Sequence, residues 1–319
     1  MIDHNAVPFS LRQIRYFLAT AETLSITEAA HRLHISQPSV STTISALEEM
    51  FGTQLFIRHH AQGMSLTPAG RLLASEARAL LKQSEELNAT LKEFSNTSST
   101  GTLEVGFLVT LAPMLMPTLT KGFTDRFPNV RVTPTEGNHA FLLDSLRTGL
   151  LDCVVTYDFS LLPELNFHSI IELPPFVLLP PEHRLAKNAS VTLVELADEP
   201  MVQLDLPLSR EYFNSLFVRA GLQPSVAYRS AFADVVHAMV AAGFGYTLWN
   251  FPLHNMMTAS GNRFISRPLE PGLLPARLGL VSLESDRPRK VVRTFHDHCI
   301  ATLTDGIPDL VAAIGLLTN

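Results

Sequence analysis

The sequence is poor in cysteine and contains no long apolar run. Its 319 residues include two cysteines, Cys153 and Cys299, which lie far apart in apolar surroundings, and we expect both to be buried, reduced thiols. No stretch of about 18 uninterrupted apolar residues occurs, and no charged N-terminal segment precedes an apolar run. We therefore expect a cytoplasmic protein without a membrane span or a signal peptide.

The motifs of common enzymes are missing too. The segment Gly243–Tyr246 does not complete a G-x-G-x-x-G pattern, and neither a G-x-x-x-x-G-K-[ST] loop nor a G-x-S-x-G elbow occurs. His296 and His298, beside Cys299, would diverge by about 200° on a helix, so a metal site there would need distortion. We expect no catalytic residues, no metal and no cofactor.

Charge is scarce for a chain of this length. Lysine and arginine number 24 against 30 aspartates and glutamates, which gives a net charge of −6, whereas 46% of the residues are hydrophobic. This much apolar side chain in a chain this long predicts two or three domains, each with a filled core.

The chain between residues 25 and 51 has the pattern of two short helices joined by a tight turn. Ser25 and Glu28 match an S-x-x-E capping box, which would start the first helix. Ser36 is a second N-cap, and Pro38 follows in the first turn of the next helix, where a missing N–H costs nothing. These signals predict a helix-turn-helix.

The second helix of this pair has an apolar face and a polar edge. An apolar stripe is expected to face the core and consists of Val40, Ile44, Leu47 and Phe51. Small uncharged side chains gather at the leading end, an arrangement that suits base edges in a major groove. The candidate base-contacting residues are Gln37, Pro38, Ser39, Ser41 and Thr42. An ordinary helical hairpin is the alternative for this segment alone.

The flanking segments favour the DNA-binding interpretation. Leu11–Ala21 predicts a preceding amphipathic helix, and Leu55–Thr67 predicts a β-ribbon with Gly63 at its bend. Three helices and a ribbon make a winged helix-turn-helix. The stretch LRQIRYFLATAETLSITEAAHRLHISQPSVSTTISALEEMFGTQLF, followed by LTPAG, resembles the LysR-type transcriptional regulators almost continuously from residue 9 to about 70.

Residues 1–95 are not basic, because eight lysines and arginines stand against nine aspartates and glutamates. Few cations are therefore available to phosphates. We expect Arg32 and Arg58 to make phosphate contacts, together with Arg12 and Arg15 on the first helix. A cytoplasmic solute-binding module that retains a relic of a DNA domain, without DNA activity, is the alternative function.

A long linker helix is predicted over residues 68–95. Its stripe alternates at spacings of four and three, as in a coiled coil, and consists of Leu73, Ala77, Leu80, Ser84, Leu87, Leu91 and Phe94. We interpret it as a dimerisation helix, although a helix packed on its own domain would show a similar stripe. Residues 96–102 then predict a flexible hinge. The resemblance implies promoter DNA as the partner and a tetramer as the assembly.

Strands alternate with helices from residue 103 to residue 319. This pattern predicts two α/β subdomains, about 103–172 with 271–319 and about 173–270, joined by two crossing segments around a ligand cleft. The expected fold class is thus multidomain: an N-terminal all-α winged helix-turn-helix over residues 1–67, a long linker helix, and the two subdomains. The resemblance implies the same periplasmic-binding-protein-like arrangement.

The cleft is expected at the carboxyl ends of strands, where helix N-termini favour a small anion. Aromatic side chains near strand ends predict its walls, although core packing is the alternative for each of them. The resemblance singles out Thr110, Asn138 and the region of Asp205. The candidate effector-binding residues are Thr110, Asn138, Thr156, Tyr157, Asp205, Phe232 and Tyr246. The expected effector is a small organic acid, with an aromatic body as one option.

The substitution Leu80→Asp places a charge in the middle of the predicted seam. We expect monomers, because an unpaired carboxylate between two helices loses its hydration without a partner. Light scattering measures the mass, and circular dichroism checks that the helix content is kept. A folded variant with the wild-type mass would refute the seam.

Overall fold

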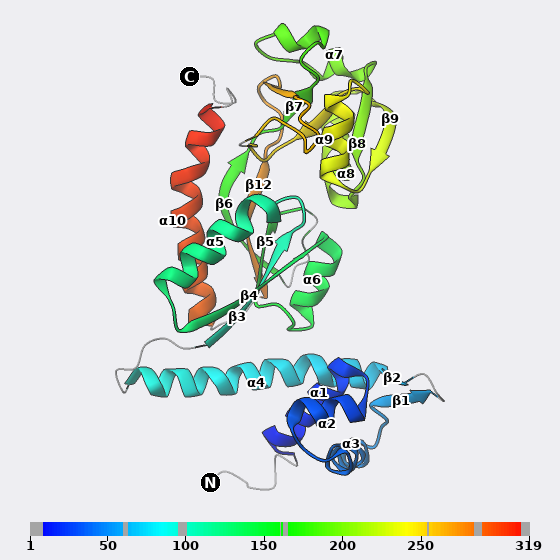
Figure 1. The fold of residues 1–319 in the computed structure, drawn as a ribbon, viewed down its shortest axis with the longest axis vertical. Helices are drawn as coiled ribbons and strands as arrows, with labels where there is room; N and C mark the ends of the chain where they lie inside the picture. Colours follow the sequence, from blue (N-terminus) through cyan, green and yellow to red (C-terminus); the bar gives the residue numbers. More distant parts are fainter. Residues whose placement is uncertain are drawn as a thin grey trace. The chain divides into compact units, whose positions relative to one another are not determined.

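The computed structural model describes residues 9–59, 63–94, 101–159, 161, 165–253, 255–283 and 289–313. The chain divides into two compact units. The first unit contains the N-terminal helices, and the second contains a five-stranded sheet, a three-stranded sheet and a two-stranded sheet with their helices (Figure 1). Within the described ranges no helix is both long and apolar enough to cross a membrane.

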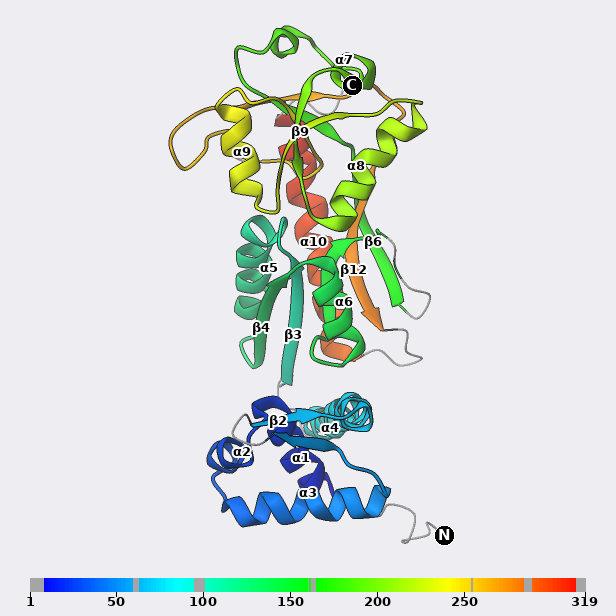
Figure 2. The same ribbon diagram turned by 90° about the vertical axis from the view of Figure 1, so that its right-hand side faces the viewer.

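Three short helices, a β-ribbon and a long helix form the N-terminal unit (Figure 2). Their bounds are α1 (Leu11–Thr23), α2 (Ile26–Leu33), α3 (Gln37–Phe51), β1 (Phe56–His59), β2 (Gly63–Leu66) and α4 (Pro68–Phe94). The three short helices share one core, which includes Ile14, Phe17, Val40, Ile44 and Leu47. The ribbon is antiparallel, with His59 opposite Gly63. The predicted winged helix-turn-helix is confirmed.

The turns between the short helices use the left-handed backbone conformation. Leu24 and His34 end α1 and α2 with φ of 51° and 54°, and Gly52 ends α3 with φ of 63°. At each position the backbone N–H donates to carbonyls of the last helical turn. This conformation is uncommon for a residue with a side chain, so the packing of the helix pair must maintain it at Leu24 and His34.

Two predicted caps form only in part. Ser25 accepts a hydrogen bond from the Glu28 N–H at 3.3 Å, but the return bond of a capping box is not formed between these two residues. Ser36 is the N-cap of α3, yet no side chain caps that helix. Its hydroxyl lies 2.7 Å from the Ser39 hydroxyl instead. The leading N–H groups of α3 therefore lack a side-chain cap.

The predicted apolar stripe of α3 is wrong at its last residue. Val40, Ile44 and Leu47 are buried, but Phe51 is 39% exposed. Its ring lies 6.0 Å, between centroids, from that of Phe9. One turn beyond Leu47 the helix extends past the core, so the periodicity continues where the packing does not.

Helix α4 packs partly on its own domain. Ala74 and Ala77 are 2% exposed, and Leu73 and Leu81 lie partly buried against the same core. The first part of the predicted seam therefore follows the alternative interpretation. Further along the helix Leu87 is 63% exposed. The side chains of Leu91 and Phe94 fall outside the described part of the structure.

The first sheet of the second unit has five strands in the order β4–β3–β5–β12–β6. Their bounds are β3 (Gly101–Leu108), β4 (Val130–Gly137), β5 (Cys153–Tyr157), β6 (Leu165–Leu173) and β12 (Ala276–Leu283). Strands β3 and β5 are parallel, and β12 runs antiparallel to β5 and β6. The helices of this part are α5 (Ala112–Arg126), α6 (His139–Arg147) and α10 (Lys290–Ala313).

Helices α5 and α10 pack against each other, and His298, one of the three residues considered as metal ligands, lies in this contact. The rings of Phe123 and Phe295 meet edge to face at 5.2 Å, and a ring nitrogen of His298 lies 3.1 Å from the Leu119 carbonyl. A Cβ at Gly122 would lie 3.0 Å from the His298 ring, so a side chain there would push the ring back by a few tenths of an ångström. His298 thus has a packing role. Among the described residues no group of three or more potential ligands could hold a metal.

The second subdomain contains a three-stranded sheet in the order β10–β7–β11 and a parallel pair, β8–β9. The strands are β7 (Phe176–Leu179), β8 (Pro200–Leu204), β9 (Ser225–Ser230), β10 (Thr247–Trp249) and β11 (Ile265–Pro268). The helices are η1 (Arg184–Lys187), α7 (Leu193–Ala197), α8 (Pro207–Arg219) and α9 (Ala233–Ala241). A parallel bridge between Met201 and Tyr246 links the two groups of strands.

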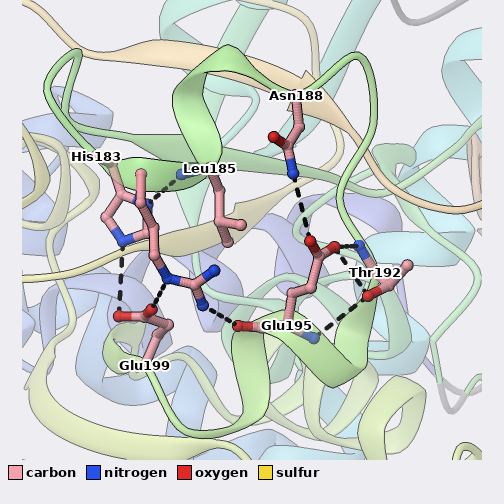
Figure 3. A network of polar contacts seen from close by, with 7 residues as sticks. His183, Leu185, Asn188, Thr192, Glu195 and Glu199 are labelled. Carbon is pink, nitrogen blue, oxygen red and sulfur yellow. Dashed lines mark hydrogen bonds and ion pairs between the residues drawn. The ribbon is translucent and has the colours of Figure 1, made fainter.

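A polar network fastens η1 and α7 to the start of β8 (Figure 3). Thr192 and Glu195 form a full capping box at the start of α7. The bonds from Thr192 lower the pKa of Glu195. Arg184 donates to Glu199 at 2.6 Å and to the Glu195 carbonyl at 3.1 Å. These bonds satisfy the backbone of a segment that has little regular structure.

Both chain segments that cross between the subdomains join the first sheet at the same end of its strands. The last residue of β6, Leu173, is paired with Ala276, the first residue of β12. Because β12 is antiparallel to β5, the carboxyl ends of β3 and β5 lie at this same end of the sheet. On the other side of the crossing, Phe176 is paired with Trp249. The register thus brings the strand ends of both sheets to the crossings.

Burial of His139 should make stability depend on pH. The side chain is 8% exposed, and desolvation lowers its pKa to about 4. The unfolded chain therefore binds a proton below about pH 6.5 that the folded chain binds only near pH 4. The contribution of neutral His139 to the free energy of unfolding is complete above pH 6.5 and is lost as the pH falls toward 4. The substitution His139→Gln should reduce this loss by about 3 kcal/mol at most, as measured by urea unfolding across this pH range.

The matched control is His31→Gln, because His31 is exposed on α2. Its unfolding free energy should keep the wild-type dependence on pH. If the unfolding free energy of His139→Gln depended on pH as that of the wild type does, the attribution of this dependence to His139 would be contradicted.

Candidate nucleic-acid interface and effector cleft

The leading end of α3 presents an exposed, uncharged edge. Gln37, Pro38, Ser39 and Thr42 are exposed and Ser41 is half-buried, above a buried layer on the opposite face of the helix. Ser39 keeps one hydroxyl partner in Ser36, and its carbonyl accepts from Thr43 at 2.8 Å. All five predicted base-contacting residues thus lie on one accessible stretch of the helix, with amide and hydroxyl groups that suit base edges.

The four arginines that are predicted to contact phosphates differ in whether another side chain of the protein already binds them. Arg58 is exposed on β1, opposite Met64 in the ribbon, and Arg15 is exposed on α1. Arg32 donates to Glu22 at 2.6 Å, so a phosphate would have to compete with this carboxylate. Arg12 donates to the Tyr16 hydroxyl at 2.8 Å and lies over the same ring. Arg58 and Arg15 are therefore the best placed of the four.

The wing carries one histidine in the described part of the structure. His59 lies within 2.8 Å of the Ser65 hydroxyl across the ribbon. The neighbouring His60 falls outside the described residues. His59 therefore links the two strands of the ribbon, and Arg58 beside it is exposed.

A narrow pocket lies in the second unit, where the strand ends of the two subdomains meet. It has a volume of about 20 Å³, which is room for about one water molecule. The lining residues are Thr110, Tyr157, Phe159, Leu204, Ser209, Phe213, Trp249, Asn250 and Phe251. Aromatic rings and a few hydroxyl or amide groups make up this lining, and none of these side chains is charged.

Two of the seven predicted effector residues, Thr110 and Tyr157, line this pocket. Thr110 does so from the loop before α5, next to Leu111, the N-cap of that helix. Tyr157 is buried and its ring lies 5.1 Å from that of Phe159. Burial raises the pKa of the Tyr157 hydroxyl. The group is therefore a neutral donor or acceptor at physiological pH.

Three predicted residues serve the local structure instead. The Asn138 amide oxygen accepts from the Phe141 N–H at 2.9 Å and so caps α6. Thr156 is fully buried, and its hydroxyl lies 3.2 Å from His139. The Asp205 carboxylate is paired with Arg210. None of these three is among the residues that line the pocket.

Phe232 and Tyr246, which were also predicted to bind the effector, do not line the pocket either. Phe232 is 72% exposed at the N-cap of α9. Tyr246 is fully buried at the start of β10, level with Met201 at the start of β8. It therefore lies at the amino end of its strand, and Trp249 lies at the carboxyl end that faces the pocket. The sequence marks a strand end but does not say which end meets the cleft.

Asn250 and Phe251 follow β10 directly, and the sequence analysis missed them. The Asn250 amide donates to the Leu173 carbonyl at 3.2 Å and to the Tyr212 hydroxyl at 3.1 Å, so it connects both subdomains. Leu204 and Phe213 were missed as well. The position after a buried strand was the available signal for Asn250 and Phe251, whereas Phe213 faces the pocket only through the packing of α8.

Three groups at this pocket have unused hydrogen-bonding capacity. No side chain caps α5 or α8, whose N-terminal segments reach the pocket through Thr110 and Ser209. The indole nitrogen of Trp249 is buried and has no hydrogen-bond partner among the described residues. It can only donate. The pocket therefore offers donors without opposing charge, which favours a ligand that accepts hydrogen bonds.

His237 closes the outer side of Trp249. Its ring meets the indole edge to face at 4.7 Å and stacks on Phe264 at 5.2 Å. Desolvation lowers the pKa of His237 to about 4. The ring is therefore neutral at pH 7 and supplies no positive charge next to the pocket.

Comparison with known proteins connects both units to one family. The bacterial regulatory helix-turn-helix of the lysR family matches residues 11–71, and the LysR substrate binding domain matches residues 96–304. XapR of Escherichia coli is 33% identical over 75% of this chain and 81% of its own length. CysB of Haemophilus influenzae is 29% identical over 74% of this chain and 73% of its own length.

Solved structures agree with these matches. HinK, a LysR family transcriptional regulator from Pseudomonas aeruginosa, is 34% identical, covers 92% of this chain and 99% of its own, and has a TM-score of 0.62. CbnR in complex with its target DNA shares the fold at 20% identity, over 91% of this chain and 98% of its own, with a TM-score of 0.60. The chain belongs to the LysR family of DNA-binding transcriptional regulators.

Proposed function

We propose that this regulator reads DNA with the leading end of α3 and responds to a small organic acid held between its two α/β subdomains. The observation that carries the DNA part is the exposed edge from Gln37 to Thr42 above a buried apolar face. A helix with small, uncharged polar groups at its N-terminus fits the major groove and can hydrogen-bond base edges.

In this proposal base contacts and phosphate contacts come from different elements. Gln37, Ser39 and Thr42 face the bases, with Pro38 and Ser41 beside them. Arg58 in the wing and Arg15 on α1 contact phosphates, and Arg32 joins them when it releases Glu22. Because few cations take part, we expect a shallow dependence of affinity on salt for each protomer.

The effector part rests on the unused donors of the narrow pocket. Two uncapped helix N-termini and the Trp249 N–H favour an anion or another strong acceptor. The aromatic lining favours a flat apolar body, so a small aromatic carboxylate fits best. Of the other predicted effector residues, Asn138, Asp205 and Phe232 can contact it only if the cleft changes shape.

An opening of the cleft explains how ligand and DNA are linked. The pocket has room for about one water molecule, so an aromatic acid needs the subdomains to move apart. A ligand that binds only the opened arrangement shifts the population toward it. In a homodimer through α4, and in a tetramer of two such dimers, that shift changes the spacing of the paired reading helices.

The remaining parts of the proposal concern organisation. We place the DNA-binding domain at residues 1–67, the linker helix at 68–95, the hinge at 96–102 and the effector-binding domain at 103–319. The protein works in the cytoplasm, where its DNA is, and acts by binding rather than by catalysis. An electrophoretic mobility shift with fragments upstream of its own gene tests the DNA part, and the absence of a retarded band at low salt would overturn it.

The substitution Ser39→Glu should abolish specific DNA binding. A carboxylate at this exposed position would face phosphates and base acceptors, and we expect a loss of at least about a hundredfold in affinity by fluorescence anisotropy. The matched control is Thr53→Glu, which adds the same charge just beyond the other end of α3. Thr53→Glu should bind within about threefold of wild type. Equal loss in both variants would show a general charge effect instead.

The substitution Trp249→Phe should weaken effector binding. It keeps an aromatic ring but removes the unpaired N–H, so we expect a roughly tenfold loss of affinity for the best aromatic carboxylate found by thermal shift. Tyr246→Phe is the control, because it removes a second buried, unpartnered polar group away from the pocket. Equal affinities of Trp249→Phe and wild type would contradict this contact.

A further inference from the structure

A second cavity lies beside the narrow pocket and is much larger. Its volume is about 630 Å³, within the range of small-molecule sites. The lining comes from the crossing segment and sheet edge of one subdomain, including Asp158 and Arg277, and from α8 of the other, including Glu211 and Tyr212. Phe159 lines both cavities and separates them. The cavity therefore has the room that the predicted effector site lacks.

The charge of this cavity is opposite to that expected for an acid-binding site. Three carboxylate side chains, Asp158, Glu172 and Glu211, line it together with one arginine, Arg277. Arg277 donates to Asp158 at 2.6 Å, and its guanidinium also lies over the Phe167 ring. This pairing neutralises Asp158 and occupies the arginine.

Glu172 and Glu211 keep their charges available. Glu172 lies on β6, opposite Arg277 in the strand register, and Glu211 lies on α8. Both side chains are exposed to the cavity and to solvent, and neither makes an ion pair or hydrogen bond within the described ranges of the chain. They reach the cavity from different subdomains.

Aromatic rings line the same cavity as these carboxylates. The rings of Phe159 and Tyr212 stack at 4.7 Å with 20° between their planes. Tyr212 is 7% exposed, and its hydroxyl donates to the Leu274 carbonyl of the crossing segment at 2.7 Å. The ring is therefore held rigidly. A rigid aromatic surface next to unpaired carboxylates suits a cation with a flat or apolar body.

We propose that this cavity binds an organic cation, an amine or a guanidinium compound. The positive group lies between Glu172 and Glu211, and the apolar body lies against Phe159 and Tyr212. Such a ligand would connect β6 of one subdomain to α8 of the other. The site is separate from the proposed effector pocket, and it does not depend on the identity of that effector.

Isothermal titration calorimetry of the full-length protein tests the proposal with three probes, tyramine, agmatine and spermidine, each titrated alone. We expect at least one to bind saturably with one site per chain. The double variant Glu172→Gln/Glu211→Gln should weaken that binding by at least about tenfold. Both side chains are exposed and glutamine keeps their shape, so the variant should fold, as a thermal melt verifies.

Matched controls separate this site from general acidity and from the narrow pocket. Glu182→Gln removes an exposed carboxylate elsewhere in the second subdomain and should leave amine binding unchanged. Trp249→Phe, in the narrow pocket, should leave it unchanged too. Tyrosol, the uncharged analogue of tyramine, should bind at least about tenfold more weakly than tyramine. Saturable binding of none of the three amines, or wild-type affinity in the double variant, would overturn the proposal.

Discussion

The pairing of β12 with β5 and β6 is the constraint on which the effector half depends. Strand β12 follows the whole second subdomain in the sequence. It lies antiparallel to β5, which is itself parallel to β3. Its first residue is level with the last residue of β6. Both crossings are therefore fixed at one edge, and the narrow pocket and the larger cavity both form there.

Two adjacent cavities of opposite chemistry result from this arrangement. The narrow pocket has uncharged donors and two uncapped helix ends, whereas the larger cavity has carboxylates and one arginine that is already paired. The stacked rings of Tyr157, Phe159 and Tyr212 lie where the two cavities adjoin.

In the DNA-binding half, one face of α3 packs in the core and its leading edge stays exposed. Val40, Ile44 and Leu47 are buried, and this fixes the roll of α3 about its axis. The leading edge of the same helix is left to solvent as a direct result. Arg32 shows that the electrostatics are set locally, because Glu22 already holds its guanidinium. The recognition proposed for this domain consequently relies on amide and hydroxyl groups more than on cations.

The sequence by itself determined the winged helix-turn-helix, the long helix and the alternation of strands and helices in the α/β half, because each shows a local signal of period or capping. Strand β6 shows little such signal, because its buried residues, Leu165 and Leu173, lie at its two ends. Only the tertiary structure decided that Trp249 rather than Tyr246 meets the pocket, and that Asn138 and Asp205 are already bonded. Strand direction and the partners of a side chain depend on segments distant in the chain, so no local pattern contains them.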